Sequence, residues 1–254
     1  MTLPTVLITG GAVRIGAALS RCFADAGWHV VIHCNRSVDK AEALAGSLPS
    51  AEVVRCDLAQ PLVATAMIRD LAARLPDWRV LINSAAVFPP DGARQMEPEV
   101  FAEVMQVNAK APVRMAQAFL RRARSNVGRR VIHVTDQKLA NPNPDFFSYT
   151  MSKHALAAAV PMMAMAADPA DRIYGLAPGA ILASHDQSDV EAEVSHRLNL
   201  LGRRTTAKEL AEAALFLATG PLESGQTLFV DSGQHLLSQP RDVLYLARQS
   251  GETA

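Results

Sequence analysis

The stretch VLITGGAVRIGAALSRCFADAG, residues 6–27, starts as a short apolar strand and continues as an amphipathic helix. Gly10, Gly11 and Gly16 lie between the two. Glycine lets the backbone turn tightly and approach a pyrophosphate, and the N-terminus of the helix offers free N–H groups and the positive end of its dipole. Glycines also serve ordinary strand-to-helix turns. Directly after the first strand of a βα alternation, however, they predict dinucleotide binding.

Short β-branched runs alternate with helix-length segments along the chain. Seven runs are expected to be strands, at residues 5–9, 29–34, 52–56, 79–83, 129–135, 171–177 and 226–230. Such an alternation indicates right-handed βαβ units. We therefore predict an α/β fold with a doubly wound, Rossmann-type parallel sheet of about seven strands and helices on both faces. Residues 1–254 are expected to form a single domain, with a lid or substrate segment around 180–204 and an unassigned tail after 230.

The charge balance and the rare residue types exclude several classes of function. Lys and Arg number 25 and Asp and Glu number 25, so no net charge attracts nucleic acid or anionic membrane, and a small-molecule partner is favoured. The basic run at 121–130 lacks interleaved aromatics and follows a helix, whose C-terminus favours cations. Neither a CxxC pair nor an HExxH motif is present, so no metal site is expected. The N-terminus has no charged leader region, and the longest apolar run, 155–167, is too short for a membrane span; both indicate a cytoplasmic protein.

The segment HCNRSVDK, residues 33–40, predicts which dinucleotide is bound. NAD-binding proteins place an acid here for the ribose 2′-OH, whereas Asn35, Arg36 and Ser37 offer hydrogen-bond donors suited to a 2′-phosphate. NADPH is therefore expected rather than NADH. Arg14 in the first helical turn favours a phosphate partner over a solvated side chain, because the helix dipole disfavours a cation there. Asp57, after the third strand, could meet the adenine edge or only start the next turn.

Tyr149 and Lys153 lie four residues apart on a predicted helix, so their side chains share one face. An ammonium group beside a phenol lowers the tyrosine pKa and prepares it as a proton donor. Asp136, thirteen residues before Tyr149, is unexpected, because a carboxylate would repel the oxyanion that forms when a carbonyl is reduced. Reduction of a C=N bond requires a proton on nitrogen, which an Asp–Tyr pair can supply. Asp136 could instead be a turn residue, and Thr135 could supply a hydroxyl if the register slips by one.

The chain resembles the short-chain dehydrogenase/reductase family over nearly its whole length, and within it the pteridine reductases, including bacterial dihydromonapterin reductases. The pieces that carry the subgroup signal are TGGAVRIG (9–16), HCNRS (33–37), CDL (56–58) and VTDQ (134–137). The family-wide pieces are INSAAVF (82–88), VNAKAP (107–112), YTMSK (149–153), LAPGA (176–180) and VDSGQ (230–234). The sequence INSAA departs from the more common Asn-Asn-Ala-Gly of the family.

The resemblance implies roles for individual residues. Tyr149 would donate the proton, Lys153 would hold the nicotinamide ribose and lower the tyrosine pKa, and Asn108 would support a water relay; with Asp136 they form the expected catalytic set. Phe88 would stack on a pterin, although it could also be a loop residue that fills the core. The expected substrate-binding residues are Arg14, Phe88, Asp136 and Tyr149. The expected cofactor-binding residues are Gly10, Arg14, Ile15, Gly16, Asn35, Arg36, Ser37, Asp57, Leu58, Asn83, Ser84, Ala85, Tyr149, Lys153, Pro178 and Gly179.

The function expected from these features is NADPH-dependent reduction of a dihydropteridine to its tetrahydro form, by hydride transfer to a ring C=N bond. Dihydromonapterin, dihydrobiopterin or a dihydrofolate-like compound would be the substrate. The alternatives are a carbonyl or 3-oxoacyl-thioester reductase that uses Thr135, and a non-catalytic NADPH-binding regulator. The resemblance also implies a homo-oligomer, a tetramer or dimer, that pairs the helices at 111–120 and 155–166.

Overall fold

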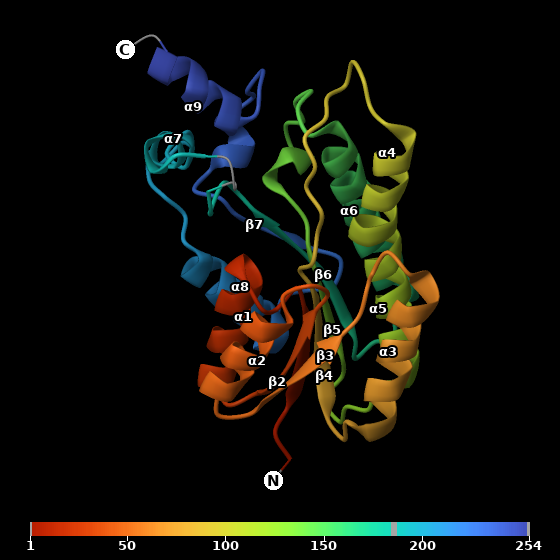
Figure 1. Cartoon of the computed structure of the whole chain (residues 1–254). Helices are drawn as coiled ribbons and strands as arrows, with labels where there is room; N and C mark the ends of the chain where they lie inside the picture. Colours follow the sequence, from red (N-terminus) through yellow and green to blue (C-terminus); the bar gives the residue numbers. More distant parts are fainter. Residues whose placement is uncertain (1, 184–186, 253–254) are drawn as a thin grey trace.

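Seven parallel strands form one sheet in the computed structural model, which describes residues 2–183 and 187–252 (Figure 1). The strands are β1 (Thr5–Thr9), β2 (His29–Cys34), β3 (Ala51–Arg55), β4 (Trp78–Asn83), β5 (Arg130–Val134), β6 (Arg172–Pro178) and β7 (Thr227–Val230), in the order β3-β2-β1-β4-β5-β6-β7. Each of the seven predicted runs coincides with one of them, with ends that differ by at most one residue. The predicted doubly wound parallel sheet is confirmed.

Helices cover both faces of this sheet (Figure 1). On one face lie α1 (Arg14–Asp25), α2 (Val38–Ser47) and α8 (Ala207–Thr219). On the other lie α3 (Pro61–Arg74), α4 (Pro98–Met105), α5 (Ala111–Arg122) and α6 (Phe147–Ala166), with the π-helical turn η1 (Gln106–Lys110) joining α4 to α5. Three short elements, η2 (Gln137–Leu139), α7 (Asp189–Ser195) and η3 (Gln234–Leu236), and the C-terminal helix α9 (Val243–Glu252) lie beyond the end of the sheet where the site is found.

Side-chain alternation along the central strands divides the core into two layers. Val6 and Ile8 pack on the face covered by α1 and α8, whereas Leu7 packs on the face covered by α3 and α5. Leu19 and Phe23, part of the apolar stripe predicted for α1, are fully buried. Burial of each such side chain contributes about 1.5–3 kcal/mol to stability. A strand buried on both faces explains why these runs are continuously apolar.

The strand order places a binding crevice at the carboxyl ends of the strands. β1 has β2 on one side and β4 on the other, so the chain winding reverses beside β1. Ligands of doubly wound sheets bind outside the strands at such a switch point. The glycine-rich turn after β1 and the segments that follow β2, β4 and β5 all reach this edge.

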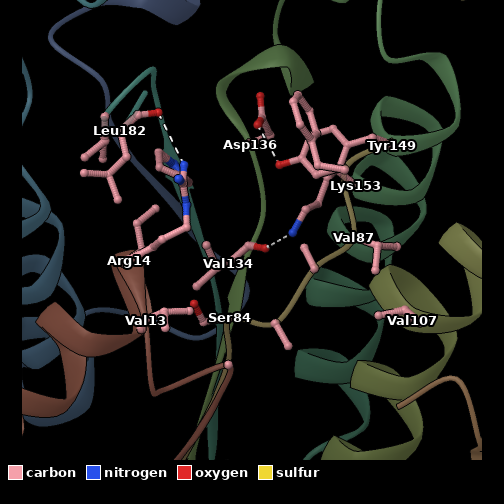
Figure 2. Close-up of a pocket in the computed structure, with 18 of the residues that line it drawn as sticks. Val13, Arg14, Ser84, Val87, Val107, Val134, Asp136, Tyr149, Lys153 and Leu182 are labelled. Atoms are coloured by element: carbon pink, nitrogen blue, oxygen red, sulfur yellow. Dashed lines mark hydrogen bonds between the residues drawn. The ribbon is translucent and has the colours of Figure 1, made fainter. Parts of the chain in front are cut away.

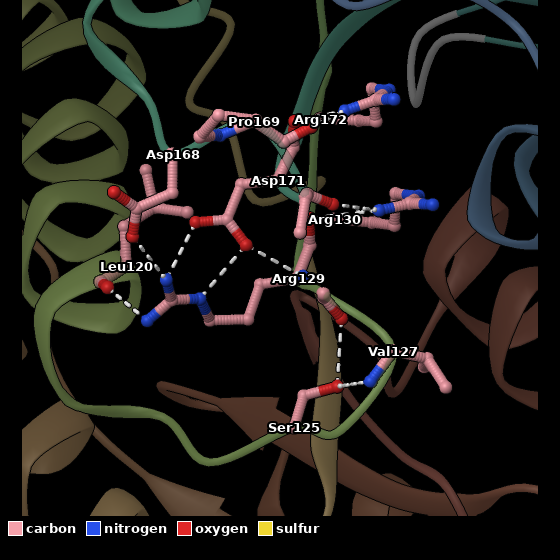
Figure 3. A network of polar contacts seen from close by, with 11 residues as sticks. Leu120, Ser125, Val127, Arg129, Arg130, Asp168, Pro169, Asp171 and Arg172 are labelled. Carbon is pink, nitrogen blue, oxygen red and sulfur yellow. Dashed lines mark hydrogen bonds and ion pairs between the residues drawn. The ribbon is translucent and has the colours of Figure 1, made fainter.

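The basic run at 121–130 is partly used within the fold. Arg129 Nε donates to Asp171 Oδ1 at 2.9 Å and Arg129 Nη2 donates to Asp171 Oδ2 at 2.7 Å (Figure 3). The same guanidinium bonds the Leu120 carbonyl and the Asp168 carboxylate. Because Asp171 is buried and lies just before β6, this network ties the end of α5 to the start of β5 and β6.

The segment predicted as a lid, 180–204, contains α7; its residues 184–186 lie outside the described residues. The tail after residue 230, for which the sequence suggested no structure, forms η3 and α9, and α9 packs beside α7 (Figure 1). Among the described residues, no helix combines the length and apolar character that crossing a bilayer requires.

Candidate active site

A cleft of about 660 Å³ opens at the carboxyl ends of the strands. Figure 2 shows the β1–α1 turn on one side and the residues that follow β5 on the other. Every residue predicted for catalysis, cofactor or substrate binding lines it except Asn83 and Asn108. The predicted residues therefore lie together at one cleft, although they come from segments that are far apart in the chain.

The glycine-rich turn has a backbone geometry that only glycine allows. Gly10 has a φ of +65°, and a Cβ atom on Gly16 would lie 2.0 Å from the Gly10 carbonyl oxygen. Helix α1 can therefore start immediately against the turn. The residue before it, Val13, makes no side-chain capping bond, so the first N–H groups of α1 remain suited to a phosphate.

His33, to which the sequence assigned no role, fixes this turn to the sheet. Gly10 N donates to His33 Nδ1 at 3.2 Å, so the ring proton is on Nε2, which lies 3.0 Å from the Cys56 carbonyl and donates to it. Burial lowers the His33 pKa to about 4, and the ring is therefore neutral. Its position within HCNRS was the only sequence signal.

The end of the cleft beside β2 and β3 fits a phosphorylated ribose. Asn35 Nδ2 donates to Asp57 Oδ1 at 3.2 Å, and the same oxygen accepts from Ala59 N at 3.0 Å, so Asp57 starts the turn after β3 and also contacts Asn35. Arg36 is exposed and makes no hydrogen bond or ion pair within the part of the chain that is described. Its guanidinium and the Ser37 hydroxyl could therefore bind a 2′-phosphate.

Arg14 connects two walls of the cleft. Its backbone has a left-handed φ of +52°. The guanidinium donates to the Ala183 carbonyl at 3.0 Å and to the Leu182 carbonyl at 3.4 Å (Figure 2). Arg14 is thus held between the β1–α1 turn and the segment after β6, beside the position proposed for phosphate.

Asp136 and Tyr149 meet inside the cleft. The Tyr149 hydroxyl donates to Asp136 Oδ2 at 2.9 Å, and Lys138 N donates to Asp136 Oδ1 at 2.9 Å (Figure 2). Asp136 caps η2, as the turn-residue interpretation expected, and it also contacts the predicted proton donor. The turn-residue interpretation is therefore confirmed, and the part of Asp136 in catalysis stays a prediction.

Thr135 does not have the position of a catalytic hydroxyl. It is fully buried, and its Oγ1 donates to the Leu176 carbonyl of β6 at 3.2 Å. Successive side chains of an extended segment point to opposite sides, so Thr135 turns away from Tyr149 while Asp136 turns toward it. The register slip considered from the sequence does not occur.

Burial favours the neutral forms of both members of the Asp136–Tyr149 pair. It raises the pKa of Asp136. It also raises the pKa of Tyr149 well above its usual value, and the neighbouring Asp136 charge adds to this effect. The expectation that Lys153 lowers the pKa of Tyr149 is therefore wrong for this arrangement, in which the pKa is raised. Lys153 Nζ instead donates to the Val134 carbonyl at 2.6 Å and lies 5.5 Å from the centre of the Tyr149 ring, and burial lowers the Lys153 pKa to about 8.

Asn108 and Asn83 are buried beneath the cleft. Asn108 lies in the π-helical turn η1, and its amide forms two 2.8 Å hydrogen bonds, to the N–H and to the carbonyl of Val87. Asn108 Nδ2 also lies 3.2 Å from the Ser152 hydroxyl on α6. Asn108 thus positions the segment before Phe88 relative to the helix that carries Tyr149. Asn83 lies 3.2 Å from the buried His133 ring.

Phe88 lies on the wall of the cleft and not in the core. Its side chain is 40% exposed, its ring stacks on Phe146 at 4.1 Å between centroids, and it meets the edge of Tyr149 at 4.5 Å. Phe146 in turn stacks on Tyr245 of α9 at 5.9 Å. An open aromatic face beside the Asp136–Tyr149 pair suits a flat heteroaromatic ring.

Several cleft residues were missed by sequence reasoning. Lys138, Asp242, Val243 and Leu244 all line the cleft. The last three come from the tail, and Asp242 Oδ2 lies 2.6 Å from Lys138 Nζ. No motif linked the two segments. The apolar pattern VLYLA at 243–247 could have indicated a helix, but not its place in the site.

The sequence and structure of the chain are similar to those of known reductases. A family model described as enoyl-(acyl carrier protein) reductase matches residues 11–235. A crystal structure of FolM alternative dihydrofolate reductase 1 from Brucella suis, in complex with NADP, aligns with a TM-score of 0.87 and 32% identity over 93% of this chain and 96% of that one.

Curated relatives include different reductases. A ketoacyl reductase of the granaticin polyketide synthase from Streptomyces violaceoruber is 29% identical, and the alignment covers 92% of this chain and 97% of that protein. Pteridine reductase 1 of Leishmania tarentolae is 25% identical, with 92% and 97% covered. Together with the fold and the Tyr149–Lys153 arrangement, these matches show that the chain belongs to the short-chain dehydrogenase/reductase family.

Proposed function

We propose that this protein reduces a dihydropteridine to its tetrahydro form with NADPH. The observation that carries the proposal is the 2.9 Å hydrogen bond from the Tyr149 hydroxyl to Asp136, inside a cleft walled by the Phe88 ring. The similarity to an alternative dihydrofolate reductase and to a pteridine reductase supports the same substrate class.

The residues present fit NADPH. The glycine-rich turn and the start of α1 would hold the pyrophosphate, and Arg36 with Ser37 would hold the 2′-phosphate. Bound NADPH would supply a hydride to the substrate carbon. The Brucella neighbour, which was crystallised with NADP, supports this choice of cofactor.

Asp136 and Tyr149 would hold the proton that the substrate nitrogen must gain. Burial raises the pKa of both groups, and the neighbouring Asp136 charge raises the pKa of Tyr149 further, so removal from water favours a proton at the cleft wall. In its ionised form the Asp136 carboxyl group would repel a developing oxyanion, and in its protonated form it offers a proton that a ring nitrogen can accept. The pair therefore favours protonation of a ring nitrogen over stabilisation of a reduced carbonyl.

Phe88 would position the pterin ring. Its partly exposed ring makes a T-shaped contact with the Tyr149 ring, and stacking on it would bring a flat ring close to the proton-donating pair. Arg14 lies on the opposite side of the cleft, where its guanidinium could contact both the substrate and a phosphate (Figure 2).

A ketoacyl reductase is the second candidate, because the granaticin relative has that activity in its name. The buried Thr135, committed to the Leu176 carbonyl, weighs against it. Oxidation of NADPH should be measured with dihydrobiopterin, dihydromonapterin, dihydrofolate and a model ketone. We expect turnover of at least one pterin or folate. Turnover of the ketone alone would refute the proposal, and NADPH binding without any turnover would favour a regulator.

We also propose that the chain self-associates through α6. Met162 and Met165 on this helix are 58% and 82% exposed in the single chain, so its apolar C-terminal part, residues 155–166, presents large apolar side chains to solvent. Sedimentation should show a dimer or tetramer, and Met165→Glu should weaken it.

A further inference from the structure

A buried ion pair lies beside the proposed proton donors and has no role in the reaction as described so far. Lys138 Nζ and Asp242 Oδ2 are 2.6 Å apart, and the two side chains are only 5% and 13% exposed. Both residues line the cleft. An ion pair this deeply buried gives little net stability, because desolvation of both charges offsets their attraction. A role in the site is therefore a better explanation than a role in stability.

Lys138 contacts Asp136 directly. Its backbone N–H donates to Asp136 Oδ1 at 2.9 Å, while the other oxygen of Asp136 accepts from Tyr149. Its side-chain ammonium donates to the Asp145 carbonyl at 3.3 Å and pairs with Asp242. The position of the η2 turn, and so that of the Asp136 carboxyl group, is tied to the C-terminal segment, defined here as residues 241–245.

The C-terminal segment is itself held by a second ion pair. Arg241 Nε lies 2.7 Å from Asp145 Oδ2, and the Asp242 N–H donates to the same oxygen at 2.8 Å. Tyr245 stacks on Phe146. Two ion pairs thus hold one segment, but only Asp242 brings a charge into the cleft. Arg241, which does not line the cleft, offers a matched control.

We propose that the Lys138–Asp242 ion pair is a positioning element of the active site. It orients Asp136 toward Tyr149, and Asp242 offsets the charge of Lys138 so that the Asp136–Tyr149 pair retains its proton. This inference rests on the proposed function, because it assigns the pair a part in the same proton delivery. It makes Asp242 a residue that acts on the reaction through its neighbours, without contact with the substrate.

The charges around Asp136 explain how the balance works. Three ionisable groups act on the Asp136–Tyr149 pair: Lys153 from α6, Lys138 from η2 and Asp242 from the C-terminal segment. After burial, which raises the Asp136 pKa, Lys138 is the largest influence and lowers it. The negative charge of Asp242 has the opposite effect to the lysine charge, because it raises the pKa of Tyr149. Beyond these lie the Arg241–Asp145 pair and, elsewhere on the cleft wall, Arg14, Arg36, Asp57, Glu103 and His196.

The test compares Asp242→Asn, Lys138→Met, the double variant and Arg241→Met. The pH profile of pterin kcat/KM is measured for each, together with the carboxyl NMR titration of Asp136 in the ligand-free protein, with labelled aspartate and assignment by Asp136→Asn. Asp242→Asn leaves the lysine charge unopposed, so the Asp136 titration and the alkaline limb should move down by about one pH unit. Lys138→Met should move both up. The double variant should lie near the wild type, because two opposite changes cancel.

Arg241→Met loosens the same segment without changing the charge beside Asp136, so it should leave both titrations in place even if it raises KM. Equal shifts in Asp242→Asn and Arg241→Met, or no shift in Lys138→Met, would overturn the inference. If Asp242→Asn does not fold, Lys138→Met and the double variant decide. The NMR titration needs no substrate. A shifted titration in a protein without pterin turnover would thus refute the proposed function and leave the charge coupling standing.

Discussion

The hydroxyl of Tyr149 donates a 2.9 Å hydrogen bond to Asp136, although the two residues come from different elements of the fold. Asp136 follows β5 and caps η2, while Tyr149 lies in the first turn of α6. Both groups are half-buried at the cleft wall, and their partial removal from water raises both pKa values. The contact therefore places two groups whose pKa values are raised by burial side by side, where they can hold a proton beside the cleft.

Arg36 should determine the preference for NADPH over NADH. Arg36→Asp removes the one guanidinium proposed at the 2′-phosphate and adds a repulsive charge, so the Kd for NADPH should rise about tenfold or more while that for NADH changes little. Fluorescence titration with both nucleotides measures this. Lys40→Asp makes the same charge change at an exposed site on α2 away from the cleft and serves as the control. An unchanged preference in Arg36→Asp would exclude the assignment of the 2′-phosphate site.

Phe88 should contribute to substrate binding through its ring. Phe88→Ala removes the stacking face, which is worth about 1–3 kcal/mol in other base–aromatic contacts, so pterin KM should rise about tenfold or more. Phe88→Tyr keeps the ring and should stay close to the wild type. Steady-state kinetics at saturating NADPH check both variants. The same KM in all three proteins would show that no substrate stacks on Phe88.

The raised pKa of Asp136 should be visible in stability. Its folded-state pKa lies above the unfolded value of about 3.9. The protonated carboxyl group therefore gives its full contribution to the stability of the fold below that pH, and this contribution is lost as pH rises through the folded-state pKa. Asp136→Asn cannot ionise. Its free energy of unfolding relative to the wild type should therefore be more favourable at pH 8 than at pH 4, by about 1.4 kcal/mol for each unit of pKa shift. Differential scanning calorimetry of the ligand-free protein measures this, and a difference independent of pH would contradict a buried, proton-holding carboxyl group.

Much of the fold and half of the site follow from local sequence patterns. The β-branched runs predicted all seven strands, because strands buried on both faces are continuously apolar. The glycine-rich turn and the Tyr149–Lys153 spacing located the cleft, since each is a short-range pattern tied to one backbone geometry. Asp136 stood out because its charge conflicts with the common chemistry at that position.

The remaining features depend on contacts between distant segments. Asp242 meets Lys138 about a hundred residues earlier in the chain, and no local pattern specifies such a pairing. The hydrogen bonds from Arg14 to the Leu182 and Ala183 carbonyls are likewise set by tertiary packing. The Tyr149 pKa was expected to fall, because the sequence indicates that a lysine is near; it does not indicate that the ammonium group bonds the Val134 carbonyl.

The most direct test of the central claim is the kinetics of Asp136→Ser, which places at this position the hydroxyl that carbonyl reduction would want. If Asp136 and Tyr149 together protonate a ring nitrogen, kcat/KM for the dihydropteridine should fall about a hundredfold or more while the Kd for NADPH stays unchanged. Reduction of a model ketone should not fall with it. A variant that reduces the pterin at the wild-type rate would show that the carboxyl group takes no part in the reaction.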